Sequence, residues 1–102
     1  MATLTWRPQA LSDLESIEEY YADIAPDYAS LLVDGLLEQA EQLEAFPRMG
    51  RIAPEIDDED IRELIYRDYR LIYIADSENG EVNVLTVIHS SQHLGSLNSG
   101  HP

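Results

Sequence analysis

Residues 61–88, IRELIYRDYRLIYIADSENGEVNVLTVI, decide the fold, because they have the pattern of three consecutive β-strands separated by two turns. Aromatic and β-branched residues, which favour extended backbone, fill three segments: Ile61–Tyr66, Tyr69–Ala75 and Val82–Ile88. Arg67-Asp68 has the length of a tight hairpin turn, and Asn79-Gly80 favours such a turn because both residues accept positive φ. Since short turns join antiparallel neighbours, the stretch predicts an antiparallel sheet.

Two amphipathic helices are predicted upstream of these strands. The first begins near Pro8, ends at Ala25-Pro26, and has apolar residues at helical spacing: Leu11, Leu14, Ile17, Tyr21 and Ile24. The second runs from Pro26 to Phe46, before Pro47, with an apolar stripe of Tyr28, Leu32, Leu36, Ala40, Leu43 and Phe46. The short link between them predicts an antiparallel helical hairpin, and each stripe needs a further layer to cover it.

A short strand at Thr3–Arg7 precedes the helices, and a loop at Arg48–Asp60 follows them. The element order is therefore β-α-α-β-β-β, which predicts an α+β fold with an antiparallel sheet packed on a helical hairpin. We expect Leu14, Leu36 and Leu43 to be buried between the two layers. Residues 1–94 form the predicted single domain, and residues 95–102, which are small and polar, form a predicted flexible tail.

The charge balance limits the classes of partner. The chain has 20 acidic and 6 basic residues and a formal net charge of -14. Because binding to phosphate backbones depends on cations, we expect no direct binding of free nucleic acid. All six basic residues are arginines, and five of them follow Pro47, so this part of the chain is predicted to form a locally positive patch: Arg48, Arg51, Arg62, Arg67 and Arg70.

Other features of the composition exclude several kinds of chemistry. The absence of cysteine excludes disulfides and thiolate metal sites, and no cofactor is expected. Met1–Arg7 lacks the pattern of a signal peptide, and no apolar run approaches the roughly 20 residues that span a bilayer. The sequence therefore predicts a cytoplasmic protein with no membrane contact.

Because the helices cover one face of the predicted sheet, we expect the other face to carry the function. The candidate cluster there comprises Glu55, Arg62, Tyr69, Arg70, His89 and His93. Pairing of Tyr66 with Tyr69 makes Arg62 and Arg70 near neighbours, and two guanidinium groups on one surface hold a phosphate or carboxylate well. His89 is a candidate acid or base near neutral pH, with Glu55 as the complementary base.

Each candidate also has a purely structural alternative. Arg62 has an acidic neighbour in Asp60, and Arg70 is placed for a cross-strand salt bridge on the sheet surface. His89 equally suits a strand end with its hydrogen bonds satisfied. His89 and His93 have the spacing of a metal pair, but no third ligand is evident, so no metal site is predicted.

The chain resembles the toxins of the ParE/RelE superfamily from about Leu4 to Leu94. The resemblance is carried by these segments in order: Arg7-Pro8-Gln9-Ala10 with Asp13-Leu14, Ile17 and Tyr20; Phe46-Pro47-Arg48-Met49-Gly50-Arg51 with Pro54-Glu55; Ile61-Arg62-Glu63-Leu64; Tyr69-Arg70-Leu71-Ile72-Tyr73; and Val84–His89. It implies the toxin of a type II toxin–antitoxin pair, held by an antitoxin segment that folds on binding. Members of the superfamily either inhibit DNA gyrase, as ParE-like toxins do, or cleave messenger RNA on the ribosome, as RelE-like toxins do.

The amino-acid sequences of these segments look more like those of ParE and plasmid-stabilisation proteins. Absence of lysine and the charge of -14 favour inhibition of DNA gyrase through protein contact. The alternative is a ribosome-dependent endoribonuclease, since Glu55, Arg62 and His89 match the glutamate, arginine and histidine of some nuclease members. The candidates for binding the target or the antitoxin are Arg51, Arg62, Tyr69, Arg70 and His93. The family often has an arginine near the position of Gln92. This chain lacks it, so no role of that arginine carries over.

Overall fold

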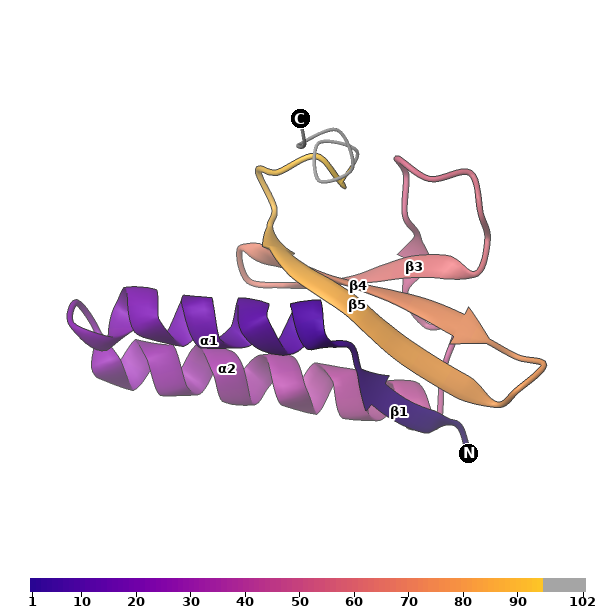
Figure 1. Cartoon of the computed structure of the whole chain (residues 1–102), viewed down its shortest axis with the longest axis horizontal. Coiled ribbons are helices and arrows are strands. Elements are labelled where there is room, and N and C mark those ends of the chain that lie inside the picture. Colours follow the sequence, from indigo (N-terminus) through magenta and orange to yellow (C-terminus); the bar gives the residue numbers. More distant parts are fainter. Residues whose placement is uncertain (95–102) are drawn as a thin grey trace.

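The computed structural model describes residues 1–94, and the predicted tail at 95–102 lies outside the described residues. Figure 1 shows two helices side by side beneath a twisted sheet. The elements are β1 (Thr3–Trp6), α1 (Pro8–Ala22), α2 (Pro26–Glu41), the 3₁₀ turn η1 (Gln42–Glu44), β2 (Arg51–Ile52), β3 (Ile61–Tyr66), β4 (Tyr69–Asp76) and β5 (Glu81–His89).

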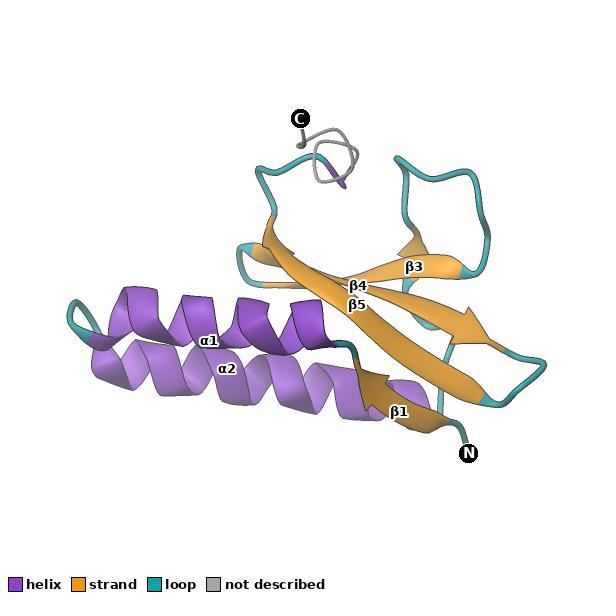
Figure 2. Cartoon of the chain, in the orientation of Figure 1, coloured by secondary structure: helices purple, strands orange, loops and turns teal. Residues whose placement is uncertain are grey.

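The sheet has the strand order β1-β5-β4-β3-β2, and the helical hairpin packs on it as predicted (Figure 2). Strands β2 to β5 are antiparallel neighbours, whereas β1 pairs with β5 in parallel. This parallel pairing is possible because both helices and strands β2 to β4 separate β1 from β5 in the chain, whereas a short turn joins only antiparallel neighbours. The predicted loop at 48–60 contains the short strand β2, in which Arg51 pairs with Glu63 and Ile52 with Arg62.

Both helices begin with a proline in the first turn, where its missing N–H removes no helical hydrogen bond. The second helix is shorter than predicted, because α2 ends at Glu41 and tightens into η1 before Pro47. Leu14, Leu36 and Leu43 are buried, as predicted. Three other members of the predicted stripes are exposed, since they lie off the covered face or beyond the helix end: Leu11, Ile24 and Phe46.

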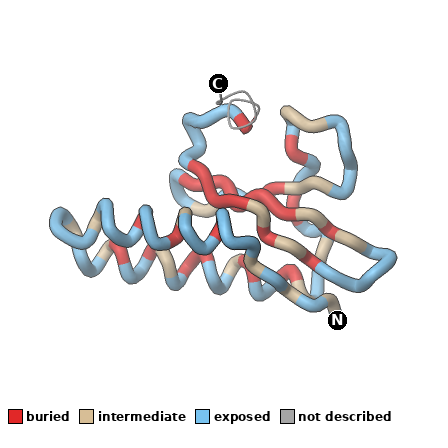
Figure 3. The backbone as a smooth tube through the Cα atoms, viewed as in Figure 1, coloured by how far each residue is buried: buried red, intermediate tan, exposed pale blue. Residues whose placement is uncertain are grey.

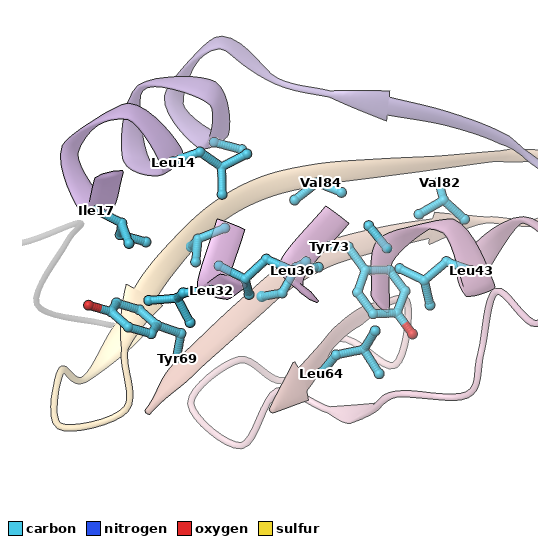
Figure 4. Close-up of a cluster of buried hydrophobic side chains, with 14 of the residues drawn as sticks. Leu14, Ile17, Leu32, Leu36, Leu43, Leu64, Tyr69, Tyr73, Val82 and Val84 are labelled. Atoms are coloured by element: carbon cyan, nitrogen blue, oxygen red, sulfur yellow. The ribbon is translucent and has the colours of Figure 1, made fainter. Parts of the chain in front are cut away.

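The larger core cluster fills the space between the helical hairpin and the sheet (Figure 4). Tyr73 of β4 is fully buried in it, and its hydroxyl accepts a hydrogen bond of 3.0 Å from the backbone N–H of Gly50. Figure 3 shows the buried residues along the middle of the sheet and on the inward sides of both helices. The core thus fixes which side chains of each strand face the helices.

A second, smaller core cluster lies on the opposite face of the sheet. It consists of Ala53, Ile72, Ile88 and Leu94, with Ile56, Ile61 and Leu85 packed against them. In Figure 1 the loop that precedes β3 and the segment that follows β5 both lie on this side. The face that we predicted to be uncovered is therefore partly covered by these two segments, because Ile72 and Ile88 need apolar cover as well.

Two specific contacts join the helices to the sheet. The carboxylate of Asp13 in α1 accepts hydrogen bonds from the Thr86 hydroxyl and, at 2.9 Å, from the Val87 N–H, next to an irregularity in the β4–β5 pairing. Gly35 of α2 lies directly against the ring of Tyr66 at the end of β3, where a Cβ atom would overlap the ring. Within residues 1–94, neither helix combines the length and the apolar content that crossing a membrane requires.

Candidate functional site

Arg70 is the centre of the candidate site, and it is only 6% exposed. It lies on the face of the sheet away from the helices, opposite Ile65 of β3 and Ile88 of β5. Its Nη1 and Nη2 each donate a hydrogen bond of 2.6 Å to the two carboxylate oxygens of Glu55. Nη1 also donates to the carbonyl oxygen of Gln92 at 3.0 Å. One guanidinium group therefore ties β4 to the loop before β3 and to the segment after β5.

Glu55 is the anionic partner of Arg70. Its carboxylate also accepts a hydrogen bond of 3.0 Å from the Leu94 N–H. The hydrogen bonds from Arg70 lower the pKa of Glu55 from 4.5 to about 2, against the opposing effect of burial. In this geometry the carboxylate stays ionised at neutral pH and has little affinity for a proton, which makes it a weak base.

Glu63 extends the network on the same face. It is 1% exposed, accepts a hydrogen bond of 2.6 Å from Nε of Arg70, and accepts another from Nε of Arg51. The hydrogen bonds that Arg70 donates to Glu55 and Glu63 raise the pKa of Arg70 further. The four side chains form a linear network, Arg51–Glu63–Arg70–Glu55, of two guanidinium groups and two carboxylates with no net charge. Arg51 is its exposed member, with 66% of its side chain accessible.

Arg62 lies on the opposite face of the sheet from Arg70, so the prediction that they share one surface is wrong. The reason is strand alternation: Arg62 is opposite Tyr73, whose side chain faces the helices. Nη1 of Arg62 donates to the carbonyl oxygens of Arg48, at 3.2 Å, and Gly50, at 3.0 Å. Its Nε donates to the Glu59 carbonyl oxygen at 3.0 Å.

Asp60, the predicted alternative partner of Arg62, instead forms an ion pair of 2.6 Å with Arg48. Arg62 thus bonds only to main-chain carbonyls among the contacts of residues 1–94, and it holds the loops on either side of β2. Its guanidinium group is used for structure in this conformation.

His89 lies at the end of β5 on the helix-facing side. Its ring meets the edge of the Tyr69 ring at a centroid distance of 5.5 Å and an interplanar angle of 80°. Nδ1 accepts a hydrogen bond of 3.1 Å from the Ser91 N–H and lies 2.7 Å from the Ser91 Oγ. Because Nδ1 is an acceptor here, the neutral ring carries its proton on Nε2. A hollow of about 270 Å³ beside it is lined by both helix and sheet residues, among them Ser16, Tyr20 and Tyr69.

The three nuclease candidates do not form one site in this structure. Glu55 lies on the face away from the helices, while Arg62 and His89 lie on the helix-facing side. The strand partners of Arg62 and His89 are four residues apart on β4, which separates them by roughly 13 Å along the strands and about 10 Å across them.

The other candidates divide between two places. Arg51, Glu55, Arg70 and His93 line one hollow of about 360 Å³, together with Ile65 and residues 90–92. Tyr69 is buried in the core between the helices and the sheet, and its pKa is raised by that burial and by a hydrogen bond with Tyr21. Among residues 1–94, no group of three or more histidines or acids is arranged to hold a metal ion.

The five arginines of the predicted positive patch all make contacts within the chain. Four of them pair with carboxylates or carbonyls as described above. The fifth, Arg67, lies over the rings of Tyr28 and Tyr66, at 5.9 and 5.5 Å from the ring centroids. Arg67 has a positive φ of 53° in the β3–β4 turn.

Exposed apolar side chains are more prominent than free cations. A hollow of about 760 Å³ is lined by Phe46 and Met49 with Gln42, Ala45, Pro47, Arg48 and Ser77. Phe46 is 66% exposed and Met49 45%. Ile52 of β2 and Ile65 of β3 are also about half exposed. Apolar patches of this kind mark contact surfaces for other proteins.

Sequence reasoning missed Glu63, whose side chain joins Arg70 to Arg51. The predicted turn already contained the information needed to place Glu63, because it fixes the register of β3 against β4. If Tyr66 is opposite Tyr69, then Glu63 falls on the same face as Arg70 and Arg62 on the other, since side chains alternate along a strand. The contacts of the Gln92 carbonyl and the Leu94 N–H could not be predicted from the sequence, because both groups belong to the main chain of an irregular segment.

The architecture is that of a small α+β domain in which a helical hairpin packs on a five-stranded sheet. The family model described as the ParE toxin of the type II toxin–antitoxin system parDE matches residues 4–94, and the chain belongs to this family. A curated relative, Toxin RelE2 of Caulobacter vibrioides, is 30% identical over 94 residues, which covers 90% of this chain and 99% of the relative.

Two solved structures share the fold. The chromosomal ParDE system of P. aeruginosa matches with a TM-score of 0.72 and 23% identity, over 87% of this chain and 96% of the other. The isolated RelE toxin of E. coli matches with a TM-score of 0.68 and 16% identity, over 97% of this chain and 95% of the other.

Proposed function

We propose that this chain is the toxin of a type II toxin–antitoxin pair, that it inhibits DNA gyrase through protein–protein contact, and that a cognate antitoxin neutralises it. Membership of the ParE toxin family supports the toxin role and the antitoxin partner. We further propose that the protein acts in the cytoplasm, where both partners are found, and that such a pair contributes to plasmid stabilisation.

The single observation that carries the proposal is the use of the arginines within the chain. An enzyme that binds ribosomal and messenger RNA needs basic side chains directed outward, because its affinity for RNA grows with the number of phosphates that they neutralise. Here the net charge is -14, and the five arginines after Pro47 are held by carboxylates, carbonyls or tyrosine rings. The exposed apolar residues Phe46, Met49 and Ile65 suit a protein partner better than RNA.

The geometry of the acid–base candidates supports the same proposal. General acid–base catalysis needs two groups within reach of one substrate, with pKa values near the working pH. Glu55 has a pKa of about 2, and it lies on the opposite sheet face from His89. Contact inhibition requires no such pair, so the arrangement is compatible with a toxin that performs no chemistry of its own.

The second candidate function is a ribosome-dependent endoribonuclease that uses Glu55, Arg62 and His89. One observation favours it: the curated relative at 30% identity bears the name RelE2. For this function the two sheet faces would need to act on different parts of the substrate, because the three side chains are far apart in the free chain.

Expression of the chain in bacteria without its antitoxin separates the two candidates. Gyrase inhibition predicts filamentous cells with induced DNA-damage response while protein synthesis continues at first. Ribonuclease activity predicts an immediate arrest of translation with cleaved messengers. Co-expression with the product of the adjacent small gene is the control, and it should restore growth in either case. Early translation arrest without DNA damage would refute the gyrase proposal.

A further inference from the structure

The turn between β4 and β5 contains the one Asn-Gly pair of the sequence, Asn79-Gly80. Both residues are exposed. Gly80 has a positive φ of 64°, and a Cβ atom added to it would meet no atom of residues 1–94 within 4 Å. The main chain at Gly80 is therefore open to solvent, and neither a side chain of its own nor a neighbouring segment covers it.

An asparagine followed by glycine is chemically labile in such a turn. The main-chain nitrogen of Gly80 can attack Cγ of Asn79, because glycine has no Cβ to hinder the approach and its backbone adopts many angles. The new N–C bond closes a five-membered succinimide, the bond from Cγ to Nδ2 breaks, and the amide nitrogen leaves as ammonia. Water then opens the ring at either carbonyl and gives aspartate or isoaspartate.

Asp76 restrains the asparagine in the folded chain. Its Oδ2 accepts a hydrogen bond of 2.8 Å from Nδ2 of Asn79, and its Oδ1 accepts one of 3.2 Å from the Asn79 N–H. These hydrogen bonds lower the pKa of Asp76, so the carboxylate stays ionised as an acceptor at neutral pH. The amide is thereby held toward Asp76 in the turn, and this contact must open before Cγ can meet the Gly80 nitrogen.

We infer that Asn79 is a site of spontaneous deamidation and that its hydrogen bonds with Asp76 set the rate of this modification in the folded chain. The modification adds a negative charge beside Asp76 and removes the donor that Asp76 accepts from. Like charges so close together destabilise the turn. This inference is independent of the proposed function, because it concerns the chemistry of the turn alone.

Isoaspartate has a second consequence, since it lengthens the main chain by one carbon between positions 79 and 80. The carbonyl oxygen of Gly80 accepts a hydrogen bond of 2.9 Å from the Thr3 N–H, at the start of the parallel pairing of β1 with β5. A longer main chain displaces this carbonyl. We therefore expect the isoaspartate form to hold β1 less firmly than the parent chain does.

The test is incubation of the full chain in warm, mildly alkaline buffer, followed by peptide sequencing in a mass spectrometer. Isoaspartate is detected with a methyltransferase that esterifies its α-carboxyl group. We expect an acid at position 79 and an intact Asn83, because Asn83 pairs with Thr5 and Ile74 within the sheet and precedes a β-branched valine. Sequencing is needed because the third asparagine, Asn98, lies outside the described residues.

Matched variants separate the hydrogen bonds of Asp76 from the acidic charge of the turn. Asp76→Ala should speed deamidation several-fold. Glu78→Ala removes the same charge from the same turn and should have a smaller effect, because among the hydrogen bonds of residues 1–94 the amide of Asn79 is held by Asp76 and not by the Glu78 side chain. Gly80→Ala should slow the reaction, since its methyl group hinders the attacking nitrogen.

The modified chain is separated by ion exchange and compared with Asn79→Asp, which has the added charge without the longer main chain. We expect a lower urea midpoint for the isoaspartate form than for Asn79→Asp. An intact Asn79 under conditions that deamidate an unstructured Asn-Gly peptide would overturn the inference. Equal rates for Asp76→Ala and Glu78→Ala would overturn the role of Asp76, and equal midpoints would overturn the effect on β1.

Discussion

The guanidinium group of Arg70 and the carboxylate of Glu55 are joined by two hydrogen bonds of 2.6 Å each, and both side chains are more than nine-tenths buried. This pair connects the middle of the sheet to a loop 15 residues earlier in the sequence. A planar guanidinium and a carboxylate match each other in this two-point arrangement, which lysine does not reproduce. The best candidate for a target-binding arginine is therefore a structural residue in the free protein.

Replacement of Arg70 should destabilise the fold strongly. Arg70→Ala leaves Glu55 and Glu63 buried without their shared cation, which typically costs about 3–5 kcal/mol. Arg51→Ala is the control, because Arg51 also binds Glu63 but is mostly exposed, and it should cost under about 1 kcal/mol. Urea denaturation measures both. Similar losses of unfolding free energy in the two variants would contradict the conclusion that Arg70 stabilises the network more than Arg51 does.

The same pair predicts a specific dependence of stability on pH. The pKa of Glu55 is lowered from 4.5 to about 2 in the fold, so its contribution is complete above the ordinary value and is lost as pH falls toward about 2. Glu55→Gln should therefore be clearly less stable than the parent chain at about pH 7, and the gap should close on acidification to about pH 2. Urea midpoints across this range provide the measurement. A gap that stays constant with pH would refute the assignment.

Gly35 should be required by the ring of Tyr66. Alanine in place of a helical glycine usually stabilises a protein by about 1 kcal/mol. Here the new methyl group would overlap the Tyr66 ring, so Gly35→Ala should destabilise the protein by about 1–3 kcal/mol. In a Tyr66→Ala background the same change should become neutral or favourable. Thermal unfolding of the four proteins decides this, and a stabilised single variant would disprove the contact.

Asp13 should matter for stability although it is one of many acids. Its carboxylate accepts hydrogen bonds from the Val87 N–H and from Thr86, and Asp13→Ala leaves both donors unpaired, at a cost of about 1–3 kcal/mol. Glu15→Ala, an exposed acid on the same helix, should change the free energy of unfolding by less than about 0.5 kcal/mol. Chemical denaturation distinguishes them, and equal effects would count against the bond between helix and sheet.

The sequence predicted the strands and helices well where local pattern determines them. The Arg67-Asp68 turn and the pairing of Tyr66 with Tyr69 are as expected, because hairpin length fixes the register. Gly80 has the predicted positive φ of 64°, but the connection to β5 spans Ser77–Gly80 and Asn79 does not share that conformation. Asp76 accepts hydrogen bonds from the Asn79 backbone and side chain, which favours this longer loop.

The candidate site was harder to predict because it depends on contacts between distant segments. The register alone would have placed Arg62 and Arg70 on opposite faces, so that error was avoidable. The partnership of Glu55 with Arg70 was not, because the loop before β3 has no periodicity that fixes where its side chains point. The parallel pairing of β1 with β5 likewise joins the two ends of the domain, which no local pattern encodes.

The most direct test of the central claim, inhibition of gyrase by contact, is a supercoiling assay with purified gyrase and relaxed plasmid. We predict that the chain blocks supercoiling and that His89→Ala, which removes the best acid–base candidate from an exposed strand end, blocks it equally well. In parallel, programmed ribosomes report messenger cleavage. Normal supercoiling in the presence of the chain, together with messenger cleavage that His89→Ala abolishes, would contradict the account.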